Sequence, residues 1–180
     1  MLEWIGTFAG IASVVLTARK SIWGWPVGLV WALSYVAIFA DAKLYSDTLL
    51  HGVYVGLQLY GWYQWRRGTD SSGESIVVQR VAKGGLGIAL AVGALGTGVL
   101  GGAMARFTDA ALPWPDAFTT AFSLVAQVLM ARRVLECWWL WIAVDAVAIA
   151  VYVSKALFVT AGLYGVFLGL ALYGWWQWTR

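Results

Sequence analysis

The sequence predicts an all-α polytopic membrane protein, in which seven transmembrane helices form two parallel three-helix repeats joined by a linker helix (3+1+3). First, 61% of the 180 residues are hydrophobic, 12% are charged and the mean hydropathy is +0.74, so polar groups are too few to cover a soluble domain. Second, charged residues separate seven apolar windows of about the twenty residues that a membrane span needs. Third, the motif YGWYQW at 60–65 returns as YGWWQW at 173–178, which indicates a duplicated unit.

The seven windows lie near residues 3–18, 23–41, 46–65, 80–104, 115–131, 137–154 and 158–178. We expect each to be a helix, because lipid offers backbone groups no hydrogen-bond partners and the windows are too long for barrel strands. The first window begins with the acidic Glu3, and its basic pair Arg19 and Lys20 follows the apolar run. That order is the reverse of a secretory signal, so we expect this helix to be retained. Between the third and fourth windows, GTDSSGES at Gly68–Ser75 has the composition of a flexible loop.

The repeat extends well beyond the six-residue motif, and its copies lie 113 positions apart, residue 60 against residue 173. Matching pairs at this offset are Arg19 and Arg132, Trp25 and Trp138, Leu50 and Leu163, Gly52 and Gly165, and Gly56 and Gly169. Three helices joined directly to three more would leave the second set inverted, whereas one extra helix restores the direction. We therefore expect a single membrane domain over 1–180, with repeats at 3–67 and 115–180 and a glycine-rich, closely packed linker helix at 80–104.

The basic residues predict the orientation of the chain in the membrane. Nine lie on one side of the predicted helices and three on the other. The nine are Arg19, Lys20, Arg66, Arg67, Arg80, Lys83, Arg132, Arg133 and Arg180, and the three are Lys43, Arg106 and Lys155. Because cytoplasmic loops carry an excess of Lys and Arg, we expect the N-terminus outside and the C-terminus in the cytoplasm.

The sequence offers little support for catalysis. One cysteine, Cys137, and one histidine, His51, give no intramolecular disulfide, no metal-ligand spacing and no Cys/His catalytic pair. The GxxxxGK[ST] motif that binds ATP phosphates is absent from the sequence. We therefore expect neither an enzyme nor a bound cofactor or metal, and active pumping would need an external partner or an ion gradient.

Tryptophan is abundant, with 13 residues, and ten of them fall near the predicted cytoplasmic ends of helices. These ten are Trp23, Trp25, Trp62, Trp65, Trp138, Trp139, Trp141, Trp175, Trp176 and Trp178. Indole rings anchor at the level of the lipid headgroups, so most of the ten are expected to form an aromatic belt. Trp31 and Trp141 lie deeper, Trp31 by roughly 12 Å beyond Trp23 at about 1.5 Å per residue. Each is suited to stacking on a flat ligand or to packing in the core.

Asp145 is the sharpest polar signal in the sequence. It lies eight residues into the sixth window, where an Asp costs about 2.5 to 3.5 kcal/mol on insertion scales. Its counterpart in the first repeat is Ala32, so the two copies differ at this point. Such a residue contacts a ligand or carries a proton, or else it joins helices while protonated or paired with Lys155.

Polar side chains also follow one face of two other windows. His51, Tyr54 and Gln58 have the i, i+3, i+7 spacing of a single helix face, and Ser123 and Gln127 are four residues apart. Both stripes suit the wall of a cavity, and both also suit hydrogen bonds between helices. We favour Tyr54, Gln58 and Gln127 as ligand contacts.

Several segments resemble the PnuC family of bacterial vitamin transporters, over essentially the whole chain. They are RKSIWGWPVGL, KLYSDTLLH and YGWYQW in the first half, and PDAFTTAFSLVAQVLMARRVLECWWLWIAVD, YVSKAL and YGWWQW in the second. The most specific stretch runs from Asp116 to Lys155, in which Trp138, Trp141 and Asp145 fall on the family pattern W-x-x-W-x-x-x-N/D. At 145 the nicotinamide riboside branch often carries Asn, whereas this chain carries Asp.

The resemblance implies a SWEET-like arrangement of seven helices, commonly trimeric, in the bacterial cytoplasmic membrane. Members carry uncharged or cationic vitamin precursors down their gradients until a cytoplasmic kinase phosphorylates and traps them. The expected partners are therefore the vitamin precursor, the lipid bilayer, two further copies of the chain and a functionally linked kinase, with no nucleic acid. Members differ in cargo, which is nicotinamide riboside, thiamine, riboflavin or deoxynucleosides.

We therefore expect facilitated diffusion of nicotinamide riboside by alternating access at a midplane site between the repeats. The expected substrate-binding residues are Trp31, His51, Tyr54, Gln58, Gln127, Trp141 and Asp145. Thiamine is the alternative cargo, because its ring is also cationic and aromatic and would suit the same carboxylate. Proton coupling through Asp145 is a third hypothesis. An intramembrane enzyme, or a scaffold that dimerises through the small-residue faces of two helices, completes the alternatives.

Overall fold

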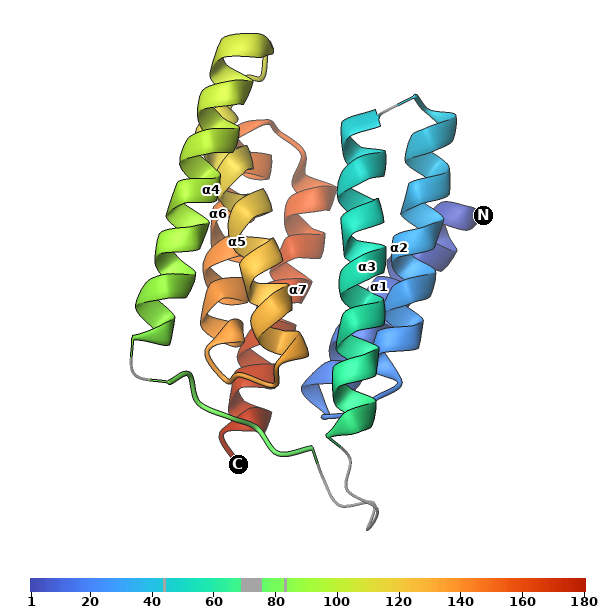
Figure 1. Ribbon diagram of the computed structural model, residues 1–180. Helices are drawn as coiled ribbons and strands as arrows, with labels where there is room; N and C mark the ends of the chain where they lie inside the picture. The colour runs from blue at the N-terminus through green and yellow to red at the C-terminus, as the bar shows by residue number, and fades with distance from the viewer. Residues whose placement is uncertain (44, 69–75, 83) are drawn as a thin grey trace.

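The computed structural model describes residues 1–43, 45–68, 76–82 and 84–180. Over these residues the chain forms seven α-helices (Figure 1). They are α1 Leu2–Ala18, α2 Gly24–Asp41, α3 Tyr45–Arg67, α4 Gly85–Phe107, α5 Pro113–Ala131, α6 Cys137–Ser154 and α7 Phe158–Trp178. All except α4 begin and end within about two residues of the predicted windows. The prediction of an all-α protein is confirmed, whereas most of the predicted loop at Gly68–Ser75 lies outside the described residues.

The start predicted for the fourth helix, at residue 80 of the window 80–104, is wrong. Helix α4 begins at Gly85, after Gly84, which has φ of 85°, a left-handed conformation that suits glycine. The segment before it is extended because it pairs with the turn between α5 and α6. The N–H of Gln79 donates to the carbonyl of Arg133 at 2.8 Å, and the Gln79 carbonyl accepts a second bond from the same turn at 2.9 Å. Hydropathy alone does not reveal this pairing, because it joins segments far apart in the sequence.

The helices pack in two groups of three (Figure 1). In the first group α2 lies between α1 and α3, and in the second group α6 lies between α5 and α7. The groups meet where α3 packs against α5 and where α7 packs against α1. Six helices therefore form a closed ring of contacts, while α4 packs against α5 at the edge of the molecule.

Helix α4 is rich in glycine, and it packs against α5 along one face only. A Cβ added at Gly93 would lie 2.7 Å from the ring of Phe122, so this glycine permits close approach. A Cβ at Gly98 or Gly102 would meet nothing within 4 Å. The close packing predicted for this helix is therefore found on the α5 side.

Four helices in the described part of the chain, α2, α4, α6 and α7, are long and apolar enough to cross a membrane. Helix α1 is apolar but has 17 residues. Helices α3 and α5 carry polar side chains, among them Gln58 and Gln127, that are buried against protein and so need not face lipid. The chain is thus a multi-pass membrane protein, as its composition predicts.

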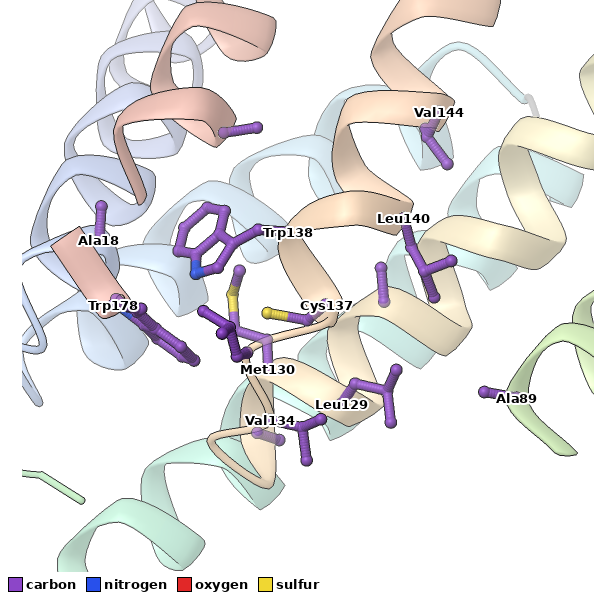
Figure 2. Close-up of a cluster of buried hydrophobic side chains, with 14 of the residues drawn as sticks. Ala18, Ala89, Leu129, Met130, Val134, Cys137, Trp138, Leu140, Val144 and Trp178 are labelled. Atoms are coloured by element: carbon purple, nitrogen blue, oxygen red, sulfur yellow. The ribbon is translucent and has the colours of Figure 1, made fainter. Parts of the chain in front are cut away.

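One end of the bundle, called the basic end below, carries the α1–α2 turn, the α5–α6 turn and the C-terminal Arg180 (Figure 1). The core reaches this end, where Trp138 and Trp178 pack near Cys137 and Met130 (Figure 2).

The predicted aromatic belt is wrong for four tryptophans, Trp25, Trp65, Trp138 and Trp178, which are buried. The reason for two of them lies on neighbouring helices. A Cβ at Gly61 would overlap the ring of Trp25, and one at Gly174 would overlap the ring of Trp138, so the glycines leave the room that these indoles occupy. Other tryptophans at this end do face outwards as a belt requires, including Trp23 at 66% exposure.

Positions 113 apart adopt the same unusual backbone geometry. Lys20 and Arg133, in the turns after α1 and α5, have φ of 59° and 61°. Lys43 and Ala156, in the turns after α2 and α6, have φ of 58° and 57°. Because left-handed residues other than glycine are uncommon, agreement at two such pairs shows that matching sequence has produced matching turns.

Candidate functional site

Five aromatic side chains cluster between α2 and α3. The ring of His51 lies with its centroid 5.4 Å from that of Trp31, 5.4 Å from Tyr35, 5.0 Å from Phe39 and 5.9 Å from Tyr54. Trp31 and Tyr54 are themselves 5.4 Å apart, nearly edge to face. The structure therefore brings together Trp31, His51 and Tyr54, three of the predicted substrate-binding residues.

Tyr54 also joins this cluster to α5. Its hydroxyl oxygen lies 2.6 Å from Oγ of Ser123, and both side chains are buried. Ser123 Oγ donates to the carbonyl of Thr120 at 2.9 Å, so the Tyr54 hydroxyl is the donor in the bond between the helices. The polar stripes predicted on these two helices therefore face each other.

The two predicted glutamines are buried on the same stripes. Gln58 lies one turn beyond Tyr54 on α3, and its amide packs over Gly28 of α2, where an added Cβ would lie 2.6 Å from Nε2. Oγ of Ser13 lies 2.7 Å from the same point, so three helices meet there. Gln127 lies one turn beyond Ser123 on α5. Each amide brings donors and an acceptor into the protein interior.

Asp145 and Trp141 come from α6. Asp145 is 4% exposed. The alternative that it pairs with Lys155 is wrong, because Nζ of Lys155 lies 3.6 Å from the carboxylate of Asp116, at the end of the bundle opposite the basic end. Tyr164 of α7 lies against α6, with its ring centroid 5.2 Å from that of Tyr152. The indole N–H of Trp141 is buried with no hydrogen-bond partner among the described residues.

Three aromatic residues of this site were missed from the sequence, namely Tyr35, Phe39 and Tyr164. Tyr35 and Phe39 follow Trp31 at i+4 and i+8, so helix periodicity would have put them on its face. Tyr164 is the counterpart of His51 at the repeat offset. Comparison of the two copies, position by position, would have found it.

A small polar cavity of about 30 Å³ lies beside Tyr164. Its lining residues are Asp116, Thr119, Ala148, Val151, Tyr152 and Tyr164. The rings of Tyr152 and Tyr164 stack at 5.2 Å along one wall. The volume and the polar lining suit one or two water molecules.

The arrangement is suited to recognition. In the described part of the chain no group of three His, Cys, Asp or Glu side chains is placed to hold a metal ion. The candidate groups are the aromatic faces between α2 and α3, the hydroxyl groups of Tyr54 and Ser123, two buried amides and the buried carboxyl group of Asp145 on α6. These groups can stack on a flat ring, hydrogen-bond its polar substituents and neutralise one positive charge.

Comparison with known proteins identifies relatives over the full length of the chain. A riboflavin/roseoflavin transporter, RibM of Streptomyces davaonensis, is 30% identical over 185 residues, covering 99% of this chain and 85% of the relative. The nicotinamide riboside transporter PnuC of Haemophilus influenzae is 27% identical, covering 99% and 79%. PnuC of Escherichia coli is 23% identical, covering 96% and 82%.

A solved structure has the same fold. The crystal structure of the vitamin B3 transporter PnuC superposes with a TM-score of 0.78 at 28% identity, covering 99% of this chain and 80% of that one. The family profile described as nicotinamide mononucleotide transporter matches residues 1–180. The chain therefore belongs to this family, the PnuC family, and is a membrane transport protein.

Proposed function

We propose that this chain carries nicotinamide riboside into the cell across the bacterial cytoplasmic membrane by facilitated diffusion. A vitamin precursor as cargo is supported by the relatives, and the choice among precursors rests on Asp145. This carboxyl group is buried one turn beyond Trp141 in a helix that otherwise carries apolar side chains. A carboxylate in such a position needs a compensating partner. The pyridinium ring of nicotinamide riboside supplies a positive charge that deprotonation cannot remove.

The surrounding side chains suit the rest of this ligand. Trp31, Tyr54 and Trp141 offer aromatic faces for the pyridinium ring, and a desolvated cation–π contact contributes about 2 kcal/mol. Gln58 and Gln127 offer amide groups to the carboxamide and to the ribose hydroxyls. His51 supplies a further ring at the end of the α3 stripe.

Alternating access would proceed by movement of the first group against the second around this site. We take these groups as the two parallel copies of the repeat, 3–67 and 115–180, with α4 as the linker, because positions 113 apart share sequence and turn geometry. The excess of basic residues at one end supports a cytoplasmic C-terminus and an external N-terminus. A homotrimer is the expected assembly, and phosphorylation by a cytoplasmic kinase would trap the cargo.

Calorimetric titration of the detergent-purified protein tests the choice of cargo. We expect tight binding of nicotinamide riboside and weak or no binding of thiamine, riboflavin and a deoxynucleoside under the same conditions. Asp145→Asn should weaken the binding of nicotinamide riboside at least tenfold, which is about 1.4 kcal/mol. Asp41→Asn is the matched control, because Asp41 is exposed at the end of α2. Equal binding by the Asp145 and Asp41 variants would remove Asp145 from the site.

Riboflavin is a second candidate, favoured by the 30% identity to RibM. Its isoalloxazine ring is uncharged, so it would draw on the aromatic faces and the amides and not on a carboxylate. Selective riboflavin binding that survives Asp145→Asn would assign this cargo. Selective binding of thiamine that is lost in the same variant would assign the cationic alternative.

Proton-coupled transport through Asp145 predicts a different kinetic result. Under facilitated diffusion, an imposed pH gradient leaves the initial rate of uptake into proteoliposomes unchanged. Under proton coupling, the gradient accelerates uptake, and Asp145→Asn abolishes this acceleration while exchange of cargo continues.

A further inference from the structure

Two tryptophans join the first group to the second at the basic end. The indole N–H of Trp65 on α3 donates to the carbonyl of Met130 in the last turn of α5, and that of Trp178 on α7 donates to the carbonyl of Thr17 in the last turn of α1. Both N–O distances are 3.3 Å, and both indoles are buried. The donors are 113 positions apart and so are the acceptors. The two bonds are therefore reciprocal, each running from one group to the other.

The same two indole rings meet at the boundary between the groups. Their centroids are 6.0 Å apart. The ring of Trp25 packs against that of Trp65 with centroids 5.3 Å apart, and the ring of Trp138 packs against that of Trp178 with centroids 5.4 Å apart. In both pairs the rings are nearly perpendicular. Four rings thus form a continuous row across the boundary, and Figure 2 shows one half of it, Trp138 and Trp178, with Ala18 beside Trp178.

A second pair of contacts, also reciprocal, crosses the same boundary. Nε of Arg132 lies 3.5 Å from the hydroxyl of Tyr60, and the counterpart side chains, Arg19 and Tyr173, interact across the same boundary. In each case a glutamine one turn further along the tyrosine's helix donates to the same hydroxyl, at 3.1 Å and 2.6 Å. These residues are more exposed than the tryptophans.

The tryptophan bonds can break without leaving a carbonyl unpaired. The Thr17 carbonyl also accepts the backbone N–H of Lys20, and the Met130 carbonyl accepts that of Arg133, each at 2.9 Å. If the end opened, water would take the place of the carbonyl at each indole N–H. A contact that costs little to exchange for water is suited to repeated opening and closing.

We propose that Trp65 and Trp178 form the gate that closes the basic end of the transport path, and that this end opens when both indoles leave the carbonyls of the opposite group. This gate rests on the proposed function in two respects, the movement of the two groups against each other and the cytoplasmic side of the basic end. Trp25 and Trp138 serve as backing for the gate, since their buried rings pack against Trp65 and Trp178.

The gate is tested by the reactivity of a cysteine that it covers. Ala18 is fully buried next to the Thr17 acceptor, so Ala18→Cys in a Cys137→Ala background reports opening without any cargo. In inside-out vesicles, Trp178→Phe should raise the rate of labelling by a membrane-impermeant maleimide about threefold to tenfold, the effect of one lost hydrogen bond. The matched control is Trp23→Phe, because Trp23 lies at the same end of the bundle but is 66% exposed, and this variant should leave the rate unchanged. Equal rates in the Trp178 and Trp23 variants overturn the gate.

The opposite half of the gate gives an independent measurement. Ala131 is the counterpart of Ala18 and is also fully buried, so Ala131→Cys combined with Trp65→Phe should show the same acceleration. The native Cys137 is fully buried, and its continued lack of reaction in an otherwise native Trp65→Phe protein shows that the core is intact.

If the Phe variants fail to fold, a covalent cross-link between the two groups tests the gate instead. Cysteines at Tyr60 and Arg132, whose side chains meet across the boundary, can be joined by a short bifunctional maleimide. The cross-link should stop uptake into proteoliposomes while calorimetric binding of the cargo persists, and unchanged uptake overturns the gate. Failure of every tested vitamin to bind would reject the proposed cargoes and leave the labelling result as it stands.

Discussion

Tyr54 donates a hydrogen bond of 2.6 Å to Ser123, and this bond joins α3 to α5 near the middle of both helices. It is buried, and it connects the aromatic cluster of the first group to the polar stripe of the second. Hydrophobic burial does not hold helices together within lipid as it does in water, so such bonds and close packing carry the association. The site is therefore held by contacts across the boundary that transport would have to move.

Ser123→Ala should destabilise the protein by about 0.6 kcal/mol and by no more than about 1.7 kcal/mol, the range of hydrogen bonds between membrane helices. The reason is that the Tyr54 hydroxyl loses its acceptor in a buried position. A double-mutant cycle with Tyr54→Phe, followed by denaturant unfolding in mixed micelles, measures the coupling. Strictly additive effects of the two substitutions would show that the bond contributes nothing.

Gly61→Ala should destabilise the protein strongly, by about 1 to 3 kcal/mol, the usual cost of overpacking. An added Cβ would overlap the ring of Trp25, which is buried and cannot move aside. Gly52→Ala on the same helix is the matched control, since its Cβ meets nothing within 4 Å. Thermal unfolding followed by size-exclusion chromatography compares the two. A larger loss of stability for Gly52→Ala would contradict the close approach of α3 and Trp25.

Asp145→Leu should stabilise the folded protein and at the same time abolish binding of a cationic vitamin. The substitution removes a buried carboxyl group that costs about 2.5 to 3.5 kcal/mol in the middle of a membrane helix. Thermal unfolding and calorimetry on the same preparation separate the two effects. Retained binding would sink the assignment of Asp145 to the site, and a large loss of stability would show that this side chain instead joins helices.

Lys155→Met should change stability by less than about 1 kcal/mol, because exposed ion pairs contribute little. Its partner is Asp116 at 3.6 Å, and both side chains are partly exposed to solvent. Unfolding at low and at high salt measures the contribution, which we expect to shrink further as salt is added. A loss of several kcal/mol would mean that this pair fastens α5 to α6.

The helices of this protein could be predicted because the medium imposes one requirement on each of them. A stretch such as Cys137–Ser154 must satisfy its backbone within itself and carry apolar side chains, so hydropathy and flanking charges locate its ends. The start of α4 escaped the same reasoning. The extended segment at Gln79 is fixed by hydrogen bonds to the α5–α6 turn, more than fifty residues away in the sequence.

The site was predicted in part for a related reason. Helix spacing puts His51, Tyr54 and Gln58 on one face, and the structure keeps them there. Helix spacing does not show which other helix that face meets, so the bond from Tyr54 to Ser123 had to come from the packing. Trp25 and Trp138 show the converse error. A tryptophan near a helix end is predicted to be an interfacial anchor, but a glycine on the next helix can leave room for it in the core.

The sequence by itself determined that the protein lies in a membrane, where its helices are, that it contains a duplication and which family it belongs to. Composition, hydropathy and motif spacing carry this information because they are local properties of the chain or can be compared directly between sequences. Tertiary structure alone decided which faces meet. In the folded protein Trp65 bonds to Met130 and Trp178 bonds to Thr17. Lys155 pairs with Asp116 and not with Asp145, and the segment at Gln79 pairs with the turn between α5 and α6. Each of these contacts depends on the relative position of helices, which side-chain volume and shape select and which no single helix encodes.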